Sequence, residues 1–337
     1  MAKYTGFPVH NSILSGAALA QQVLSRYHLP TPISCDFFNN GVNHTYIVKA
    51  GSTTCFLRIY RYGWRSKAEI QAELEMLTYL HRRRLPVSRP IEKKDGSCLT
   101  SINCPEGVRY AVLFTNAPGK GVSWDNEKRC LYGELAGRIH ACLDRMPDDH
   151  RRFHLDLPHL VDAPLRHIQP FLQHRPQDFD YLHGIAPELK ARIDELLPGR
   201  SKPEYGNCHG DHHGGNVCED KKGRMVLFDF DCYGYGWRAY DLAVFRWSGT
   251  PWDEGSVKAK SQATKGWNAF LRGYSRVRSL GPKELEATKV FVAIRHIWLG
   301  GMHTQGAEGW SRGWINDGYF DFHLKFIKRW IKYHKVL

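Results

Sequence analysis

The chain has 337 residues and a formal net charge of +13, with 42% hydrophobic and 12% aromatic residues. This length favours two lobes or domains over one small core, and the apolar content excludes an intrinsically disordered protein. No apolar run reaches the roughly 18 residues that a membrane-spanning helix needs, so no membrane partner is expected.

A basic balance of this size can indicate nucleic-acid binding. The basic residues are spread along the chain, however, and the densest runs, "HRRR" at 81–84 and "KFIKRWIKYHK" near the C-terminus, are typical of solvated helix faces. Nucleic acid is therefore not expected as a partner. An anionic ligand such as a nucleotide accounts equally well for part of the charge.

The nine cysteines stand singly, without a C-x-x-C pair, which is typical of reduced thiols rather than of a disulfide framework. The first thirty residues lack the basic start and apolar block of a signal peptide. Both observations predict a cytoplasmic protein.

The first part of the chain alternates strand-like and helical patterns. An amphipathic helix is expected from about Ser15 to Tyr27, followed by strand-like runs between residues 33 and 60 that are separated by the turn "NNGVNHT". The next helix has Ser66 as its N-cap and an apolar face of Ile70, Leu74, Leu77 and Leu80. With strands at "CLTSI" and "YAVLF", residues 1–114 are predicted to form a small β-rich lobe.

A connector at residues 115–119 ("TNAPG") separates this lobe from residues 120–337, where helical periodicity dominates. One predicted helix has an apolar stripe, and "RMVLFDFD" is the one β-rich interruption. The fold class predicted is α+β, with a small β-rich N-terminal lobe and a larger, mainly helical C-terminal lobe. The stripe consists of Leu131, Leu135, Ile139 and Leu143.

The segment "HGDHHGGN" at 209–216 is dense in possible metal ligands. Imidazoles bind zinc well, but adjacent histidines such as His212 and His213 point apart on a regular backbone and do not easily share one ion. A catalytic zinc site is therefore not favoured.

The spacing within and after this segment suits phosphoryl transfer. Asp211 precedes Asn216 by five residues, and Asn216 precedes Asp229 by thirteen. Transfer to a hydroxyl needs one carboxylate that orients the hydroxyl and accepts its proton. It also needs a carboxylate and an amide oxygen that hold Mg²⁺ against the phosphates. Asp211 is the predicted catalytic residue, and Asn216 and Asp229 are the predicted metal ligands.

These residues carry a family resemblance. "HGDHHGGN" resembles the H-G-D-x-x-x-x-N motif of the aminoglycoside phosphotransferase and choline kinase superfamily. "FDFDCYGYGWRAYDLA" is similar to the element that follows it there, in which a metal-binding aspartate precedes a second aspartate by twelve residues, here Asp229 and Asp241. The resemblance implies a protein-kinase-like fold with ATP and Mg²⁺ as cofactors. The layout is closest to bacterial stress-response Ser/Thr kinases and homoserine-kinase-like members.

The resemblance also implies a phosphate-binding lysine on the third strand, and Arg58 stands there instead. Arginine keeps the charge but offers a bidentate fork in place of a point charge. The alternative is that Lys49 or Arg61 contacts the phosphates. The partner glutamate would come from the following helix, where Glu73 is better placed than its neighbours Glu69 and Glu75.

Three further nucleotide contacts are implied. Asn43, in the loop with the single glycine Gly41, would offer donors to phosphate oxygens. The carbonyl of Thr115 and the N–H of Ala117, in the connector, would pair with the adenine edge.

Three residues near the motif are assigned supporting roles. His209 is expected to stabilise the catalytic loop rather than to accept a proton. Asp241 is expected to accept hydrogen bonds from the loop around His209. For Asp231 two roles remain open, a ligand of a second Mg²⁺ or a residue that supports the metal site from behind.

The acceptor is predicted from charge alone. The segment after Phe245 has more basic than acidic residues, which favours a small hydroxyl compound that is neutral or anionic over a polycationic aminoglycoside. A protein substrate and a nucleotide-binding pseudokinase are the alternatives, and no oligomeric state is predicted. Aromatic residues that would wall the pocket are Trp247, Trp252, Trp298, Trp310, Trp314 and Tyr319.

Overall fold

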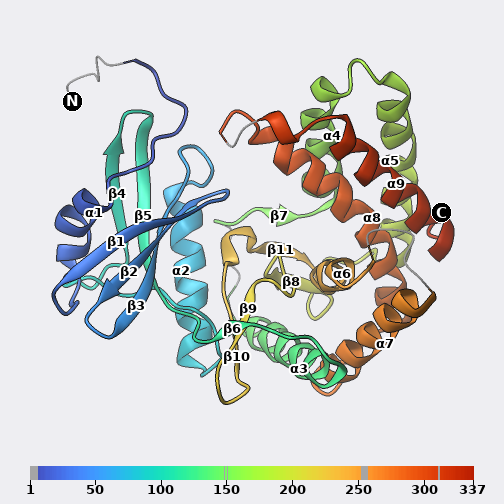
Figure 1. Ribbon diagram of the computed structural model, residues 1–337. Coiled ribbons are helices and arrows are strands. Elements are labelled where there is room, and N and C mark those ends of the chain that lie inside the picture. Colours follow the sequence, from blue (N-terminus) through green and yellow to red (C-terminus); the bar gives the residue numbers. More distant parts are fainter. Residues whose placement is uncertain (1–6, 148, 150, 252–256, 310–311) are drawn as a thin grey trace. The chain divides into compact units, whose positions relative to one another are not determined.

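The computed structural model describes residues 7–147, 149, 151–251, 257–309 and 312–337 (Figure 1). The chain divides into two compact units. The first comprises Met1–Pro118 with Glu308–Ser311, and the second comprises Gly119–Ala307 with Arg312–Leu337. The first unit is built on a β-sheet and the second is mainly helical, so the predicted α+β class is confirmed.

The first unit contains a five-stranded sheet in the order β1-β2-β3-β5-β4, with antiparallel neighbours throughout. The predicted strand-like runs correspond to these strands. The register places Arg58 of β3 between Thr45 of β2 and Val112 of β5. The strands are β1 (Ile33–Asn40), β2 (His44–Ala50), β3 (Thr53–Ile59), β4 (Leu99–Cys104) and β5 (Gly107–Thr115).

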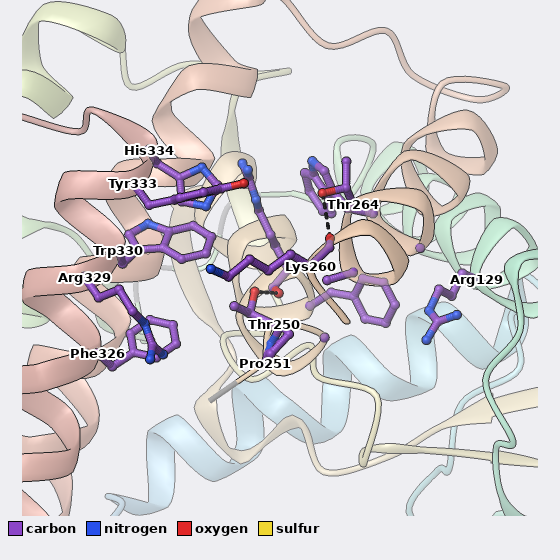
Figure 2. A pocket seen from close by; sticks show the side chains of 16 residues that line it. Arg129, Thr250, Pro251, Lys260, Thr264, Phe326, Arg329, Trp330, Tyr333 and His334 are labelled. Carbon is purple, nitrogen blue, oxygen red and sulfur yellow. Dashed lines mark hydrogen bonds between the residues drawn. The ribbon is translucent and has the colours of Figure 1, made fainter. Parts of the chain in front are cut away.

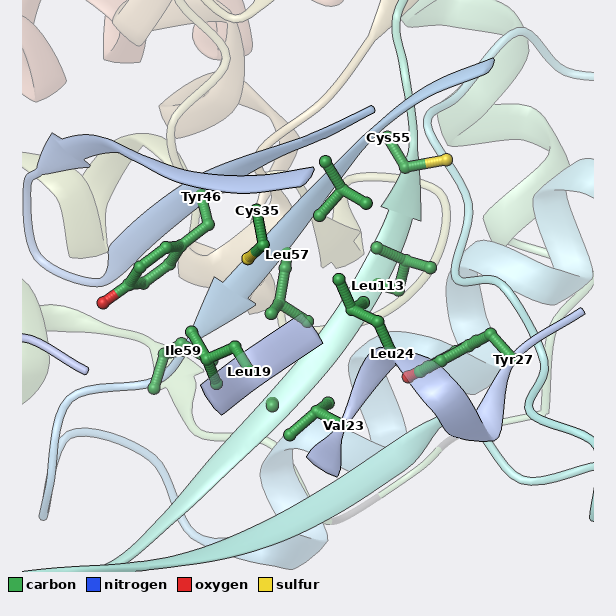
Figure 3. Close-up of a cluster of buried hydrophobic side chains, with 12 residues drawn as sticks. Leu19, Val23, Leu24, Tyr27, Cys35, Tyr46, Cys55, Leu57, Ile59 and Leu113 are labelled. Carbon is green, nitrogen blue, oxygen red and sulfur yellow. The ribbon is translucent and has the colours of Figure 1, made fainter. Parts of the chain in front are cut away.

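One face of this sheet is covered by the N-terminal helix α1 (Gly16–Gln22), which is shorter than the predicted helix and ends in a tight turn at Leu24–Arg26 (Figure 3). Alternate strand residues point to this face, as the period of two requires. The buried cluster there comprises Leu19, Val23, Leu24, Tyr27, Cys35, Tyr46, Val48, Cys55, Leu57, Ile59, Ala111 and Leu113.

The helix after β3 is α2 (Lys67–Arg82), and its start is confirmed as predicted. The Ser66 hydroxyl accepts from the Glu69 N–H at 3.2 Å, and the Glu69 carboxylate accepts from the Ser66 N–H at 2.8 Å. This reciprocal pair is a capping box, which satisfies two donors that the first turn would otherwise leave open. All four predicted apolar positions of the helix are buried.

The second unit contains larger helices and two small sheets. No helix in the described ranges combines the length and apolar character that crossing a membrane requires. The helices are α3 (Asn126–Leu143), α4 (Ala163–Ile168), α5 (Pro176–Leu196), α6 (Arg238–Ser248), α7 (Val257–Tyr274), α8 (Pro282–Gln305) and α9 (Asp317–His334).

The predicted stripe of α3 is wrong at one position, because Leu131 is exposed while Leu135, Ile139 and Leu143 are buried. Helices α3 and α7 approach closely at glycine positions, and the buried face of α3 is the face that carries these small residues. A Cβ on Gly133 would lie 2.0 Å from the Phe270 carbonyl oxygen. The close approach places Tyr132, rather than Leu131, in the interior.

The prediction of a single β-rich interruption in this unit is also wrong. The two sheets have the orders β10-β9-β6 and β7-β11-β8. Each of these six strands has two to four residues, too few for a clear alternating pattern. They are β6 (Lys120–Gly121), β7 (His154–Leu155), β8 (Tyr205–Cys208), β9 (Val217–Glu219), β10 (Met225–Leu227) and β11 (Gly234–Trp237).

Helix α8 is the centre of the second unit. It packs against α4, α5, α6 and α9, and its middle is buried on all sides. A charged residue in this middle part therefore lies inside the unit. Arg295 is such a residue.

Candidate active site

The first unit brings together two of the predicted cofactor-binding residues. The Arg58 guanidinium, on β3, donates to Glu73 Oε1, on α2, at 2.9 Å. The other carboxylate oxygen accepts from the Tyr60 hydroxyl at 2.9 Å, so both oxygens of the buried Glu73 have partners. Glu69 is engaged in the helix cap instead. Of the three glutamates considered, Glu73 is the one that the structure pairs with Arg58.

The loop between β1 and β2 is held by Arg61. Its guanidinium donates to the carbonyl oxygens of Val42 at 2.8 Å and Gly41 at 2.9 Å, and its N–H donates to Asn43 Oδ1 at 3.1 Å. Two donors of the Arg61 guanidinium and its backbone N–H thus serve the loop, whereas Lys49 is exposed on β2. These contacts favour Arg58 over Arg61 as the phosphate ligand. The side chain of Asn43 is buried, so its contact with a phosphate stays a prediction.

The connector is tied to the segment before β4. The Thr115 N–H donates to the Arg89 carbonyl at 2.9 Å, and its carbonyl accepts from the Ser88 hydroxyl at 2.6 Å. One lone pair of that carbonyl is therefore used within the protein. The adenine contacts of Thr115 and Ala117 stay predictions.

The second unit holds the predicted catalytic loop, between β8 and β9. The two carboxylate oxygens of Asp211 face different partners. Oδ1 accepts from the Arg295 guanidinium, while Oδ2 accepts from Asn216 Nδ2 at 3.1 Å and lies 3.5 Å from His213 Nε2. Asn216 Nδ2 also donates to the Asp211 carbonyl at 2.9 Å. Burial raises the pKa of Asp211, but Arg295 and then His213 outweigh it and hold that pKa below its usual range.

Asp241, at the start of α6, accepts the hydrogen bonds that the sequence predicts for it. The N–H of His209 donates to Oδ2 at 2.7 Å, and the N–H of Gly210 donates to Oδ1 at 2.8 Å. His140, on α3, lies 3.1 Å from Oδ2 and was not predicted. Burial alone would raise the pKa of Asp241, but the hydrogen bond with His140 holds it below its usual range.

His209 has a fixed tautomer. The Phe228 carbonyl can only accept, so the ring Nε2 at 3.1 Å carries the proton, and Nδ1 accepts from the Asp211 N–H at 3.3 Å. Burial lowers the pKa of His209, which keeps the ring neutral. One ring nitrogen is bonded within the loop and the other to Phe228, which agrees with the predicted structural role.

A backbone hydrogen bond brings the segments of the two predicted metal ligands together. The N–H of Phe228, the residue before Asp229, donates to the Asn216 carbonyl at 3.0 Å. Asp229 follows Phe228 and is exposed. Sequence analysis placed it in a strand, but β10 ends at Leu227 and Asp229 adopts a left-handed conformation with φ 63°. Asp231 is buried in the next turn, which favours the supporting role over that of a ligand.

The two adjacent histidines of the loop point to different places. His212 stacks on the buried Tyr132 with ring centroids 4.6 Å apart, whereas His213 faces Asp211. Within the described ranges, no three His, Cys, Asp or Glu side chains gather into a group that could hold a metal ion. A metal site built from Asn216 and Asp229 would need further oxygens, from nucleotide phosphates or water, to complete the coordination of the ion.

Arg295 is the main residue that sequence analysis missed. It lies 84 residues after Asp211, outside both motifs. One signal was available, since "VFVAIRHIWL" is an apolar helical run with a single arginine. A lone charge in a buried helix requires a partner.

Four of the predicted pocket aromatics are described. Trp247 and Trp298 flank Arg295, and Trp314 and Tyr319 contact the His303 ring at centroid distances of 4.9 and 5.7 Å. Trp252 and Trp310 lie outside the described residues.

A cavity of the second unit lies among α6, α7 and α9 (Figure 2). Figure 2 shows Lys260 between Thr264 of α7 and Trp330 of α9. Neither Asp211 nor the four described pocket aromatics line this cavity, and its described lining residues include no Asp or Glu. The lining combines the cations Arg129, Arg246, Lys260 and Arg329 with the rings of Phe245, Trp267, Phe326, Trp330 and Tyr333.

Comparison with protein families matches residues 35–280 to the phosphotransferase enzyme family. An uncharacterized protein of Deinococcus radiodurans is 35% identical over 97% of this chain and 93% of its own length. The amicoumacin kinase of Bacillus subtilis is 23% identical over 79% of this chain and 78% of its own length. A homoserine kinase of Caulobacter vibrioides is 29% identical over 79% and 80%.

Solved structures of similar fold include two small-molecule kinases. The amicoumacin kinase hAmiN, in complex with AMP-PNP and Ca²⁺, superposes with a TM-score of 0.75 at 20% identity, over 95% of this chain and 94% of that one. The microcompartment-associated aminopropanol kinase gives a TM-score of 0.74 at 19% identity, over 95% and 99%. Both resemble the whole chain in fold.

Proposed function

The chain belongs to the phosphotransferase enzyme family, and we propose that it moves the γ-phosphoryl group of ATP, with Mg²⁺, to a hydroxyl group of a small molecule. The observation that carries the proposal is the catalytic loop. Asp211 is held from both sides, Asn216 is bonded to it, and Asp229 is presented to solvent next to them.

The role of Asp211 follows from the transition state. Phosphoryl transfer passes through a loose transition state, so the attacking hydroxyl needs orientation more than early deprotonation. A carboxylate that three neighbours hold in place can accept a hydrogen bond from the hydroxyl in one fixed direction. The proton then passes to Asp211 as the bond to phosphorus forms. A depressed pKa is compatible with this late transfer and keeps the carboxylate ionised beforehand.

The donor set fits Mg²⁺. This ion prefers oxygen ligands and is commonly held by one or two side chains together with substrate phosphates. The Asn216 amide nitrogen faces Asp211, which leaves its oxygen on the other side of the group. That oxygen and the exposed Asp229 carboxylate would hold the ion, and Asp231 would support the turn behind them. When bound, the ion would neutralise charge on the phosphates and screen them from the carboxylates.

The first unit would supply the nucleotide contacts. The Arg58 guanidinium has one end fixed on Glu73 and stacks over the Phe114 ring at 4.9 Å, so it is preorganised to bind phosphate oxygens. Asn43 and the backbone of Thr115 and Ala117 would complete the site.

We infer a small acceptor, and a neutral or anionic one, on two separate grounds. The names of the relatives, amicoumacin kinase and homoserine kinase, refer to small molecules rather than proteins. The preference for a neutral or anionic acceptor rests on the excess of basic over acidic residues after Phe245. A Ser/Thr protein kinase and a nucleotide-binding pseudokinase are the competing proposals.

The test is an acceptor screen with the purified full chain. ADP release from Mg·ATP is measured with homoserine, aminopropanol, sugars, nucleosides, anionic hydroxy acids, aminoglycosides and a generic protein substrate, and products are checked for an added phosphate by mass. The proposal expects a phosphorylated product from a neutral or anionic small molecule. Nucleotide binding without turnover on any compound supports the pseudokinase, and phosphoserine in the protein substrate supports the protein kinase.

A further inference from the structure

Arg295 is a buried cation whose contacts converge on the catalytic loop. One terminal nitrogen donates to Asp211 Oδ1. The other donates to the Gly210 carbonyl at 3.2 Å and to the Tyr240 hydroxyl at 3.0 Å. The side chain therefore bonds the carboxylate of Asp211 and the backbone just before it. It reaches this position from α8, far away in the sequence.

The guanidinium also lies over two indole rings. Its central carbon lies 4.3 Å from the centroid of the Trp298 ring and 5.3 Å from that of Trp247. Each indole N–H has its own acceptor, His159 Nε2 at 3.4 Å for Trp298 and His296 Nε2 at 3.0 Å for Trp247. Because the flanking rings are themselves fixed, the guanidinium has little room to swing.

Stability alone is a poor reason for this arrangement. Desolvating both charges of a buried ion pair costs about as much as their attraction returns, and apolar replacements are often as stable. The direction of the contacts gives a better reason. Arg295 holds Oδ1, and Asn216 holds Oδ2, so together they fix the plane of the one carboxylate that the reaction is proposed to use.

We propose that Arg295 is a positioning residue for phosphoryl transfer, which aims the Asp211 carboxylate at the acceptor hydroxyl. This inference rests on the proposed function of Asp211. It extends the site to α8, which carries no family motif, and makes the rigid Trp247–Arg295–Trp298 stack part of the catalytic machinery.

The experiment is a double-variant cycle of Arg295→Met with Asp211→Asn in the full chain. The readout is kcat for ADP release from Mg·ATP, with water as the acceptor and, in parallel, with the best acceptor of the screen. If Arg295 acts through Asp211, Arg295→Met lowers kcat roughly 10- to 100-fold, the range expected for a charged hydrogen bond, with KM for ATP unchanged. In the Asp211→Asn background the same change has an effect of less than about threefold.

Matched variants separate this role from a structural one. Arg276→Met removes an exposed arginine that pairs with Glu134 at 3.1 Å, and it leaves kcat unchanged. If Arg295→Met does not fold, Tyr240→Phe removes one acceptor of the guanidinium and lowers kcat a few-fold, again only when Asp211 is present. Arg295→Lys, which keeps the charge, recovers part of the loss.

The outcomes are distinct. Equal, additive losses in both backgrounds, or a fall in thermal stability with kcat per folded molecule unchanged, overturn the positioning role. Full activity of Asp211→Asn alone overturns the proposed function instead, whatever Arg295 does.

Discussion

The two units each contain an arginine–carboxylate pair at their candidate site, and the pairs are arranged in opposite ways. In the first unit the carboxylate is the hidden member, since the Glu73 side chain is 0% exposed and that of Arg58 is 12% exposed. In the second unit the cation is hidden, since the Arg295 side chain is 2% exposed and that of Asp211 is 22% exposed. The first unit thus offers a cation to its surroundings, and the second offers an anion.

This difference suits the two halves of a phosphoryl transfer. A partly exposed guanidinium can bind phosphate oxygens, and a partly exposed carboxylate can accept a hydrogen bond from a hydroxyl. The buried partner holds the exposed one in each case. Substitutions in the Arg58–Glu73 pair should therefore change nucleotide binding, and substitutions in the Arg295–Asp211 pair should change turnover.

The largest effect is expected for Asp229→Ala, beside the second pair. Without this carboxylate the proposed metal site keeps only Asn216 as a protein ligand, so turnover should fall below detection and Mg·ATP should bind more weakly. Isothermal titration with Mg·AMP-PNP and an ADP-release assay measure the two effects. Turnover that survives, or a zinc ion whose removal and return switch activity off and on, would contradict the assignment.

A smaller effect is expected for Arg58→Ala, in the first pair. Loss of a charged hydrogen bond to phosphate should lower kcat/KM for ATP about 10- to 100-fold, mainly through KM, and Arg58→Lys should recover part of it. Lys49→Ala and Arg61→Ala are the comparison variants, measured by the same initial-rate assay. Unchanged ATP kinetics in Arg58→Ala would transfer the phosphate contact to one of those two residues.

The smallest effect is expected where the helix that carries Glu73 begins. Ser66→Ala removes half of the capping box and should lower the free energy of unfolding by about 1 kcal/mol, measured by urea denaturation. Ser15→Ala is the control, because its hydroxyl accepts from the Ala18 N–H at a long 3.4 Å. A loss at Ser15 as large as that at Ser66 would show that the cap geometry does not determine the effect.

Short-range patterns explain what could be predicted from the sequence. The strands of the first unit, the apolar face and cap of α2, and the Asp211–Asn216–Asp229 spacing all depend on neighbours within a few tens of residues. Arg295 and His140 could not be placed in this way, because they reach the loop through the packing of α8 and α3. The prediction that Leu131 is buried was wrong for a related reason. The close contact of α3 with α7 at Gly133 determines which face of α3 is buried, and Leu131 lies outside that face.

The account depends most directly on Asp211. Asp211→Asn keeps the size of the side chain and one acceptor oxygen, but it removes the negative charge and the proton acceptor. We expect kcat to fall roughly 10²- to 10⁴-fold, the range of a general base, while the affinity for Mg·AMP-PNP measured by calorimetry stays nearly unchanged. Near-normal transfer by Asp211→Asn to the acceptor found in the screen would contradict the proposed mechanism.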